Sequence, residues 1–429
     1  MSSEWPIKPL SQVAEVITGF PFKGEDYLPP HKGVRVVRGD NVTERYVRWG
    51  EKEKCWSEVT PALRPYVLRT GDIVIGMDGS KVGRNFAAIG SEDNGTLLAQ
   101  RVARVRAREG VSQDFVRYAI CNPSFTGYVK AVHTGTSIPH ISKGQIEKFE
   151  ISVPPLQTQI SIAAILSALD DRITLLRETN TTLEAIAQAL FKSWFVDFDP
   201  VHAKMQGRAP EGMDEATAAL FPDSIEESEL GSVPKGWRVG NLNVLAELNP
   251  ESWSAKRHPE RVLYVDLANT KAGQIDEYIE FSFEDAPSRA RRVLRCGDVI
   301  VGTVRPGNRS FARIASDVTG LTGSTGFAVL RARKVIDQAL VFIAATNDEA
   351  IDRLSHLADG GAYPAVRPEV VGSTPLVVAT EEIRNSFGDI ANTLFASIGA
   401  NQERMTQLAS LRDTLLPRLI SGQIDLNTL

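Results

Sequence analysis

Residues Leu68–Gly76 read Leu-Arg-Thr-Gly-Asp-Ile-Val-Ile-Gly, and residues Leu294–Gly302 read Leu-Arg-Cys-Gly-Asp-Val-Ile-Val-Gly. In both stretches a Gly-Asp turn leads into a run of β-branched residues, which is the pattern of a short buried strand. A pattern that occurs twice in one chain indicates an internal duplication, and a duplication decides the architecture. We therefore expect two similar domains.

The similarity continues on both sides of these stretches. Arg106-Ala107-Arg108 recurs as Arg331-Ala332-Arg333, at an offset of 225 residues. Further pairs recur at offsets of 232 upstream and 225 downstream, namely Trp5 and Trp237, Leu10 and Leu242, Asn122 and Asn347, Gly135 and Gly360, and Pro139 and Pro364. The two halves therefore share one plan and differ by small insertions.

Each half is expected to combine short strands with one long helix. In the first half, the apolar runs Val34–Val37, Ile73–Ile75 and Val102–Val105 predict strands. Two helical patterns end the halves, one over Leu156–Phe195 and one from about Glu381 to Ser421.

The long helices carry the alternating four- and three-residue spacing of a coiled-coil seam. At about 1.5 Å per residue a helix of about 38 residues would be close to 57 Å long, so we expect the two helices to pair rather than expose their seams. Pro417 predicts a broken or kinked last turn in the second helix. The predicted seam residues are Ile162, Leu166, Leu169, Ile173, Leu176, Asn180, Leu183, Leu190 and Trp194, with Phe387, Leu394, Ile398, Asn401, Met405, Leu408 and Leu415.

Two polar residues in the seam, Asn180 and Asn401, suggest a register for this pairing. Placing them together in an antiparallel pair also brings Trp194 opposite Phe387, and apolar residues then meet along most of the length. One mismatch sets Leu169 opposite Arg412, whose side chain would have to snorkel to water. The alternative is a slightly different register with both asparagines facing solvent.

The net charge of −5 conceals an uneven distribution. Residues 1–155 hold 21 basic and 17 acidic side chains, whereas residues 196–230 hold 2 and 9. The chain also has 33 Arg and 15 Lys, a bias that suits phosphates and guanine edges but also arises in GC-rich genomes. No apolar run is long enough for a membrane span, no secretory signal is evident, and three scattered cysteines fit a reducing cytosol.

These features resemble the DNA-specificity subunit of Type I restriction–modification systems over nearly the whole chain. The resemblance is carried by the duplicated Gly-Asp strand, by Thr134-Gly135-Thr136-Ser137-Ile138-Pro139-His140-Ile141, and by Val153-Pro154-Pro155-Leu156-Gln157. It is also carried by Trp194–Pro200 and by Val233-Pro234-Lys235-Gly236-Trp237 in the connector. In the second half the Pro-Pro-Leu-Gln element is reduced to Val378-Ala379-Thr380-Glu381, so the start of the second long helix is less well marked.

The resemblance implies an α+β fold of two mixed α/β target-recognition domains separated by two long antiparallel coiled-coil helices, with pseudo-two-fold internal duplication. It implies a non-catalytic subunit that binds double-stranded DNA and assembles with methyltransferase subunits and a motor-nuclease subunit. The expected boundaries are 1–155 for the first domain, 156–197 for the first spacer helix, 198–230 for an acidic connector, 231–378 for the second domain, and 379–429 for the second spacer helix and tail.

The best candidates for reading DNA are glycine-rich loops after the repeated strand. Glycines let the backbone approach phosphate, while Arg, Lys and Asn supply hydrogen bonds to phosphates and base edges. A second pair of candidate loops contains Gly135 and Gly360; the alternatives are a hairpin with solvated charges for the first pair and a structural turn for the second. The candidates are Ser80, Lys81, Arg84, Asn85, Thr136, Ser137, His140, Arg305, Asn308, Arg309, Tyr363 and Arg367.

Catalytic and metal-binding patterns are not evident. Asn122-Pro123-Ser124-Phe125 superficially resembles a methyltransferase tetrad, but its repeat counterpart is Asn347-Asp348-Glu349-Ala350 and it reads more simply as the end of a helix at a turn. Asp72 and Asp298 are expected to cap turns. We expect no metal and no cofactor. The alternative functions are a coiled-coil scaffold that binds no DNA and a stand-alone DNA methyltransferase.

Overall fold

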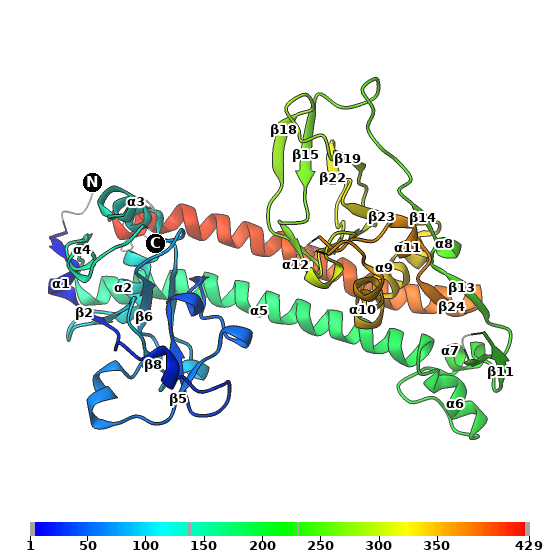
Figure 1. The fold of residues 1–429 in the computed structure, drawn as a ribbon, viewed down its shortest axis with the longest axis horizontal. Coiled ribbons are helices and arrows are strands. Elements are labelled where there is room, and N and C mark those ends of the chain that lie inside the picture. The colour runs from blue at the N-terminus through cyan, green and yellow to red at the C-terminus, as the bar shows by residue number, and fades with distance from the viewer. Residues whose placement is uncertain (1–4, 136–138, 230, 362, 425–429) are drawn as a thin grey trace. The chain divides into compact units, whose positions relative to one another are not determined.

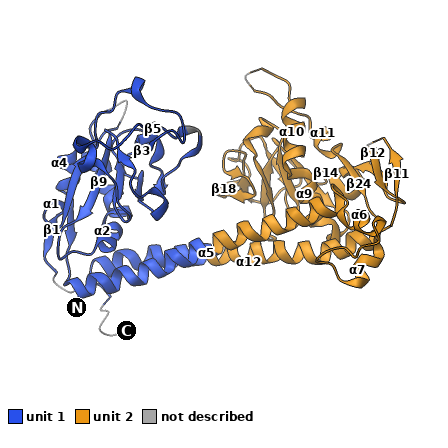
Figure 2. Ribbon diagram, turned by 90° about the horizontal axis from the view of Figure 1, so that it is seen from below, with its two compact units in different colours: residues 1–175, 405–429 blue, residues 176–404 orange. Residues whose placement is uncertain are grey.

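The computed structural model describes residues 5–135, 139–229, 231–361 and 363–424. The chain divides into two compact units, residues 1–175 with 405–429 (unit 1) and residues 176–404 (unit 2), as Figure 2 shows. The division falls inside both long helices, so each helix contributes to both units. Over the described residues, no helix combines the length and apolar character needed to cross a bilayer.

Unit 1 is built around a five-stranded sheet with the order β2-β9-β6-β7-β4. The strands of this sheet are β2 (Ala14–Thr18), β4 (Glu44–Arg45), β6 (Ile73–Gly76), β7 (Phe86–Ala88) and β9 (Val102–Ala107). A smaller sheet contains β3 (Val34–Val37), β5 (Cys55–Trp56) and β8 (Leu97–Leu98). The remaining elements are β1 (Ile7–Pro9), α1 (Leu10–Val13), α2 (Gln113–Ile120), α3 (Pro123–Val132), α4 (Lys143–Glu147) and β10 (Glu150–Ser152). The strands predicted in the first half are confirmed.

Unit 2 contains two four-stranded sheets, with the orders β14-β23-β20-β21 and β18-β15-β22-β19. Their strands are β14 (Ala246–Leu248), β15 (Arg261–Val265), β18 (Ile279–Ser282), β19 (Ala290–Val293), β20 (Val299–Gly302), β21 (Phe311–Arg313), β22 (Leu321–Ser324) and β23 (Phe327–Ala332). Other elements are β13 (Arg238–Asn241), α8 (Leu242–Leu245), β16 (Thr270–Lys271), β17 (Gln274–Ile275), α9 (Gln338–Thr346), α10 (Asp348–Leu357), α11 (Pro368–Gly372) and β24 (Pro375–Val378).

The two units repeat the same strand plan, which confirms the duplication. In both units the repeated strand lies between two antiparallel neighbours: β6 lies between β7 and β9, and β20 lies between β21 and β23. An early strand of each half, β2 or β14, then pairs with the other edge of β9 or β23.

The buried aspartate before each repeated strand also has the same partners in both units. The Asp72 carboxylate accepts two hydrogen bonds from Arg106, at 2.7 and 2.6 Å, and one from the Arg69 backbone N–H at 2.8 Å. Asp298 accepts two from Arg331, both at 2.8 Å, and one from the Arg295 N–H. The expected turn-capping role is therefore confirmed, and the arginine adds a buried two-bond ion pair.

Each long helix is continuous over 40 residues, as α5 (Leu156–Phe195) and α12 (Glu381–Ile420) in Figure 1. These bounds confirm the predicted start at Glu381. The expectation of a broken last turn is wrong, because α12 continues through Pro417 to Ile420. Proline removes one backbone donor, and a single missing bond in the final turn leaves the rest of the ladder intact.

The helices run antiparallel within each unit, and in unit 2 the predicted register is confirmed. The Asn401 side-chain N–H₂ donates to the Asn180 Oδ1 at 2.8 Å, and the Asn180 N–H₂ donates to the Ile398 carbonyl at 3.3 Å. Trp194 lies against Phe387 with ring centroids 6.0 Å apart. The alternative in which both asparagines face solvent is therefore wrong, since Asn401 is buried.

Every predicted seam residue is buried or half-buried, but two corrections are needed. The pattern missed Ala187 and Phe191, which are also buried on α5. Arg412 does not snorkel: its side chain is 9% exposed and its Nη1 lies 2.7 Å from the Asp170 carboxylate in unit 1. Asp170 directly follows the seam residue Leu169 in the sequence. The ion-pair partner of Arg412 therefore lies at the edge of the helix–helix seam.

The segment between the halves is folded in unit 2. It contains α6 (Asp199–Met205), α7 (Glu215–Leu220), β11 (Ile225–Ser228) and β12 (Gly231–Pro234). Phe221 is buried and contacts Trp194 and Trp237, at ring-centroid distances of 5.0 and 6.4 Å. This aromatic cluster joins the connector to the end of α5.

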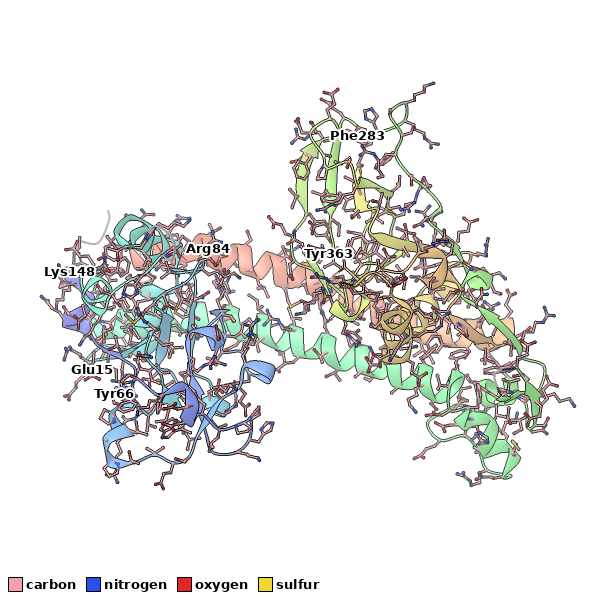
Figure 3. The ribbon with its side chains drawn as sticks, viewed as in Figure 1. Glu15, Tyr66, Arg84, Lys148, Phe283 and Tyr363 are labelled. Carbon is pink, nitrogen blue, oxygen red and sulfur yellow. The ribbon has the colours of Figure 1, made fainter. Side chains whose placement is uncertain are left out.

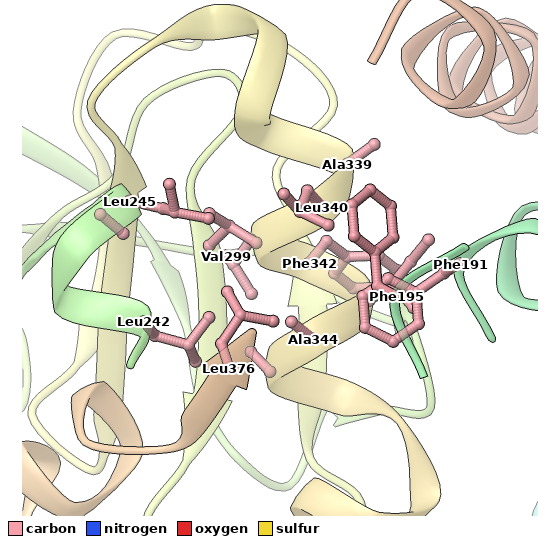
Figure 4. Close-up of a cluster of buried hydrophobic side chains, with 14 of the residues drawn as sticks. Phe191, Phe195, Leu242, Leu245, Val299, Ala339, Leu340, Phe342, Ala344 and Leu376 are labelled. Atoms are coloured by element: carbon pink, nitrogen blue, oxygen red, sulfur yellow. The ribbon is translucent and has the colours of Figure 1, made fainter. Parts of the chain in front are cut away.

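The main apolar cores include residues of the long helices. In unit 2, Phe191 and Phe195 of α5 pack with Leu340 and Phe342 of α9 and with residues of the sheet (Figure 4). In unit 1, Leu416 and Leu419 of α12 are buried in the same core as Leu166 of α5. Burying a large apolar side chain contributes about 1.5–3 kcal/mol, so these helices are structural parts of both units.

Candidate functional site

In unit 1, the two candidate loops predicted from separate parts of the chain lie side by side. The Gly79 N–H donates to the Pro139 carbonyl at 3.1 Å, and the Ile141 N–H donates to the Met77 carbonyl at 2.8 Å. We call residues 77–85 with the described part of 134–141 loop pair 1.

Unit 2 brings the corresponding loops together with the same backbone hydrogen bonds. The Arg305 N–H donates to the Pro364 carbonyl at 2.7 Å, and the Val366 N–H donates to the Thr303 carbonyl at 2.9 Å. We call residues 303–310 with the described part of 359–367 loop pair 2. The second segment of this pair projects away from the long helices of unit 2 (Figure 2).

Loop pair 1 presents polar and cationic side chains on a tightly packed backbone. Ser80, Lys81 and Arg84 are exposed and Asn85 is half-buried, and Figure 3 labels Arg84. Gly83 packs against α3, where a Cβ would lie 3.0 Å from the Val129 side chain. Thr136 and Ser137 lie outside the described residues.

His140 helps to hold loop pair 1 together. Its backbone exchanges two hydrogen bonds with Thr134, at 2.9 and 2.8 Å, and its Nδ1 lies 3.0 Å from the Met77 carbonyl oxygen. These contacts agree with the structural-turn alternative for this segment. A contact between His140 and phosphate stays a prediction.

Loop pair 2 presents a different set of side chains on the same backbone arrangement. Arg305 lies over the ring of Tyr363, with its guanidinium carbon 4.7 Å from the ring centroid, and Tyr363 is 72% exposed. Arg309 forms an ion pair with Asp348 at 2.7 Å. Asn308 and Arg367 are exposed.

The loop pairs also share two left-handed backbone positions, and the residues there differ. In loop pair 1 both are glycines, Gly79 with φ of +98° and Gly83 with φ of +84°. In loop pair 2 both are arginines, Arg305 with φ of 48° and Arg309 with φ of 58°. A side chain disfavours this conformation, so the arginines occupy positions that glycine would fill more easily.

One cationic residue beside loop pair 1 was missed by the sequence analysis. This residue is Arg101, and its equivalent in unit 2 is Gly326. The Arg101 carbonyl accepts a hydrogen bond from the Met77 N–H at 2.9 Å, and the Gly326 carbonyl accepts the corresponding bond from the Thr303 N–H at 2.8 Å. Arg101 is 60% exposed and lies 3.7 Å from Asp78. A comparison of the repeats at this position would have found it, because an arginine in one half replaces a glycine in the other.

A basic cavity of about 400 Å³ adjoins loop pair 1. Its cationic lining residues are Arg45, Arg84 and Lys130. The lining also includes Asn122, whose side chain caps α3 by accepting from the Ser124 N–H at 2.8 Å. The expectation that Asn122–Phe125 ends a helix is therefore corrected, because α2 ends at Ile120 and Asn122–Phe125 form the N-cap and first turn of α3. Among the residues that the structure describes, no group of three or more His, Cys, Asp or Glu side chains is placed to hold a metal ion.

The sequence of this chain is similar to those of one group of known proteins. Residues 2–185 match the family model described as the Type I restriction modification DNA specificity domain. The chain is 22% identical to the specificity subunit of the Type I restriction enzyme MjaIX of Methanocaldococcus jannaschii, over 98% of this chain and 94% of that protein. It is also 22% identical to the HindI specificity subunit of Haemophilus influenzae, over 85% and 89%.

A solved structure has a similar fold. The crystal structure of a Type I restriction–modification S subunit from M. genitalium aligns with a TM-score of 0.53 and 15% sequence identity, covering 97% of this chain and 96% of that one. At this identity the likeness concerns the fold alone.

Proposed function

We propose that the chain is a specificity subunit of a Type I restriction–modification system and that it reads a bipartite DNA target, with one half-site for each loop pair. It is the non-catalytic DNA-recognition component of its complex. One observation carries the two-half-site proposal: the same loop scaffold is built twice and carries different side chains each time. Phosphate contacts position a protein on DNA, whereas different side chains at equivalent places read different bases.

The charges of the loop pairs support roles for individual residues. Arg84 lines a cavity together with Arg45 and Lys130, and Lys81 is exposed on the same loop, so we assign Lys81 and Arg84 to DNA phosphates. The remaining candidates are assigned to phosphate, sugar or base contacts in the two half-sites, and they are Ser80, Asn85, Thr136, Ser137, His140, Arg305, Asn308, Arg309, Tyr363 and Arg367.

The proposed domain division follows from this assignment. The two target-recognition domains are residues 1–155 and 231–378. The spacer helices, with the C-terminal tail, are residues 156–197 and 379–429. The connector is residues 198–230. We assign the two continuous 40-residue helices to setting the distance between the half-sites, because the spacing of two DNA-recognition domains must follow the DNA helical repeat.

The subunit acts with partners in a complex. Double-stranded DNA, methyltransferase subunits and a motor-nuclease subunit are the partners of this group of proteins. We place the complex in the cytoplasm, where the DNA and a reducing environment for the cysteines are found.

The test is co-expression of the full chain with a cognate methyltransferase subunit, followed by mapping of methylated adenines. We expect methylation at one bipartite sequence, in which two short defined parts are separated by a gap of fixed length. Methylation without a sequence preference, or no DNA binding by the complex, would contradict the proposal. The latter result would favour a scaffold that binds no DNA.

A further inference from the structure

We propose that the basic cavity of unit 1 holds one phosphate of the DNA backbone, whereas unit 2 fills the corresponding place with a carboxylate of its own. The inference rests on the proposed function and deepens it, because it assigns Arg45 and Lys130 to DNA together with Arg84. It also makes the two DNA-recognition domains unequal, since unit 1 has a phosphate contact here that unit 2 lacks.

Three cationic side chains line the cavity, and each comes from a different element. Arg45 lies on β4, Arg84 in loop pair 1 and Lys130 in the last turn of α3. Arg84 and Lys130 are exposed, and within the described part of the chain their side chains have no hydrogen-bond or ion-pair partner. Arg45 Nη2 lies 3.5 Å from Asp413, but that carboxylate also pairs with Arg412 at 2.8 Å, so it neutralises Arg45 only in part.

The acidic groups around the cavity do not balance these charges. Glu44 is the acidic residue of the lining, and Asp413 is shared with Arg412. Three cations against these two carboxylates leave the cavity with a surplus of positive charge. Like charges that converge repel one another, so an anion bound among them is favoured.

The strands that follow the loops identify the corresponding residues of unit 2. Arg45 pairs in parallel with Ala87, the second residue of β7, and Gly273 pairs in parallel with Ala312, the second residue of β21. Both have a left-handed φ, 78° for Arg45 and +89° for Gly273. Unit 2 thus has the residue that this backbone favours, whereas unit 1 keeps an arginine there against the steric pressure of its Cβ.

Arg84 corresponds to Arg309 when the loops are counted back from the same strands. The loop of unit 1 is one residue longer, so counting forward aligns Gly83 with Arg309 and counting back aligns Arg84 with it. Both arginines lie two residues before the strand. The carbonyl of each accepts a hydrogen bond from the first strand residue, Phe86 at 3.1 Å or Phe311 at 3.0 Å.

In unit 2 a carboxylate stands beside this arginine. Asp348 is the first residue of α10, and its carboxylate lies 2.7 Å from Arg309. The first residue of α3 in unit 1 is the uncharged Pro123. Lys130 of α3 corresponds to Ser355 of α10, at the same distance from the start of the helix. Unit 2 therefore supplies an anion for its arginine from within, while unit 1 has more cations and no acidic residue at that position.

A DNA phosphate is the anion that fits the position of the cavity. The cavity adjoins loop pair 1, which is proposed to lie on DNA. Phosphate oxygens accept several charge-assisted hydrogen bonds, so cations from three elements can bind one phosphate together. Such a contact carries no base information but fixes the register of a protein on the duplex. It would therefore position loop pair 1 against its half-site.

The first experiment compares the wild type with the double variant Arg45→Gly and Lys130→Ser, which carries the residues of unit 2. Each protein, in complex with its methyltransferase subunit, is titrated with duplexes of the mapped target in which one phosphate at a time is an uncharged methylphosphonate. We expect one replacement, in one half-site, to weaken binding of the wild type by about tenfold and to leave binding of the variant unchanged. The variant should also show a salt dependence lower by about one ion.

Stability and general charge effects are controlled separately. The thermal unfolding temperature of the double variant should not fall, because glycine accepts the left-handed backbone at position 45. The variant Lys148→Ser removes an exposed lysine of unit 1 that lies apart from Arg84 (Figure 3), and its scan should match that of the wild type. The same scan for the wild type and the double variant would overturn the inference.

The second experiment supplies the carboxylate from within unit 1. Pro123→Asp introduces the residue that unit 2 has at this position, and an aspartate suits the first turn of a helix. It should remove the effect of the same methylphosphonate, because the phosphate is then opposed by a fixed carboxylate. Pro123→Asn is the matched control without the charge and should keep that effect. Identical scans for the two variants would count against the inference.

Inorganic phosphate distinguishes a DNA phosphate from a free anion. Suppose that equilibrium dialysis without DNA shows phosphate binding to the wild-type complex and none to the double variant, while the DNA scans agree. The cavity then takes a free anion, and the assignment to DNA fails. In each of these failures the unchanged protein still prefers its mapped sequence. A wild-type complex with no sequence preference would instead overturn the proposed function itself.

Discussion

At the scale of single residues, the two halves share the same hydrogen-bond partners around a buried aspartate. Asp72 and Asp298 each cap a turn and each receive two hydrogen bonds from an arginine on the neighbouring strand. A buried carboxylate without a partner would be costly, so the arginine is required wherever the aspartate is kept. The Gly-Asp motif in the sequence pointed to the turn, but nothing in its spacing identified the arginine on the next strand as the partner.

Replacing Asp298 with Asn tests this arrangement. The substitution keeps the shape and an acceptor for the turn, but it removes the charge opposite Arg331, so the free energy of unfolding of unit 2 should fall by about 3 kcal/mol. Chemical denaturation of the full chain measures the change. The control is Glu280→Gln, which removes a carboxylate paired with Arg261 on the exposed surface and should leave stability nearly unchanged. An equal effect of both substitutions would contradict the argument.

Acid should weaken unit 2 through Glu251. Hydrogen bonds from Arg295, and then from Arg331, lower the pKa of the Glu251 carboxyl below its ordinary value of 4.5. A carboxylate with a lowered pKa stabilises the fold at pH values above its ordinary pKa, and this contribution is lost as the pH falls through the folded-state pKa. The difference in denaturation midpoint between the wild type and Glu251→Gln should therefore shrink from pH 6 to pH 3. A difference that does not change with pH would exclude this role.

At the scale of elements, the long helices were predictable because their signal is local and repeated. The seam spacing and the two asparagines predicted both the helices and the register, whereas the pairing of Arg412 with Asp170 was missed. The sequence pattern placed Arg412 opposite Leu169, and the pairing depends on a side chain at the edge of the seam. The convergence of the loops was also missed, because hydrogen bonds such as Gly79 to Pro139 depend on how distant segments dock.

The asparagine pair should specify register at a cost in stability. Asn401→Leu removes the donor to the Asn180 Oδ1, so the free energy of unfolding should fall by about 1 kcal/mol. The double variant Asn180→Leu with Asn401→Leu should recover this loss or exceed the wild-type stability, because two apolar residues then meet in the seam. Chemical denaturation of the three proteins forms the comparison. A double variant less stable than the single one would show that the amides contribute net stability.

At the scale of the whole molecule, two target-recognition domains in one chain should each recognise one half of the DNA target. Exchanging residues 1–155 for those of a related specificity subunit should change one half of the methylated sequence and leave the other half and the gap unchanged. Mapping of methylated adenines by sequencing gives the answer directly. A change in both halves, or in neither, would show that the two domains do not read separately.

The sharing of the helices between the units has a consequence for synthesis. The core of unit 1 includes Leu416 and Leu419, and Arg412 pairs with Asp170 in the same unit. Residues 1–175 leave the ribosome well before Arg412, Leu416 and Leu419 are synthesised, because all of unit 2 (residues 176–404) is synthesised in between. The domain that is translated first is thus completed last, and until then its apolar face is open to chaperones. A premature stop codon near residue 405 would damage the N-terminal domain although every one of its first 175 residues had been made.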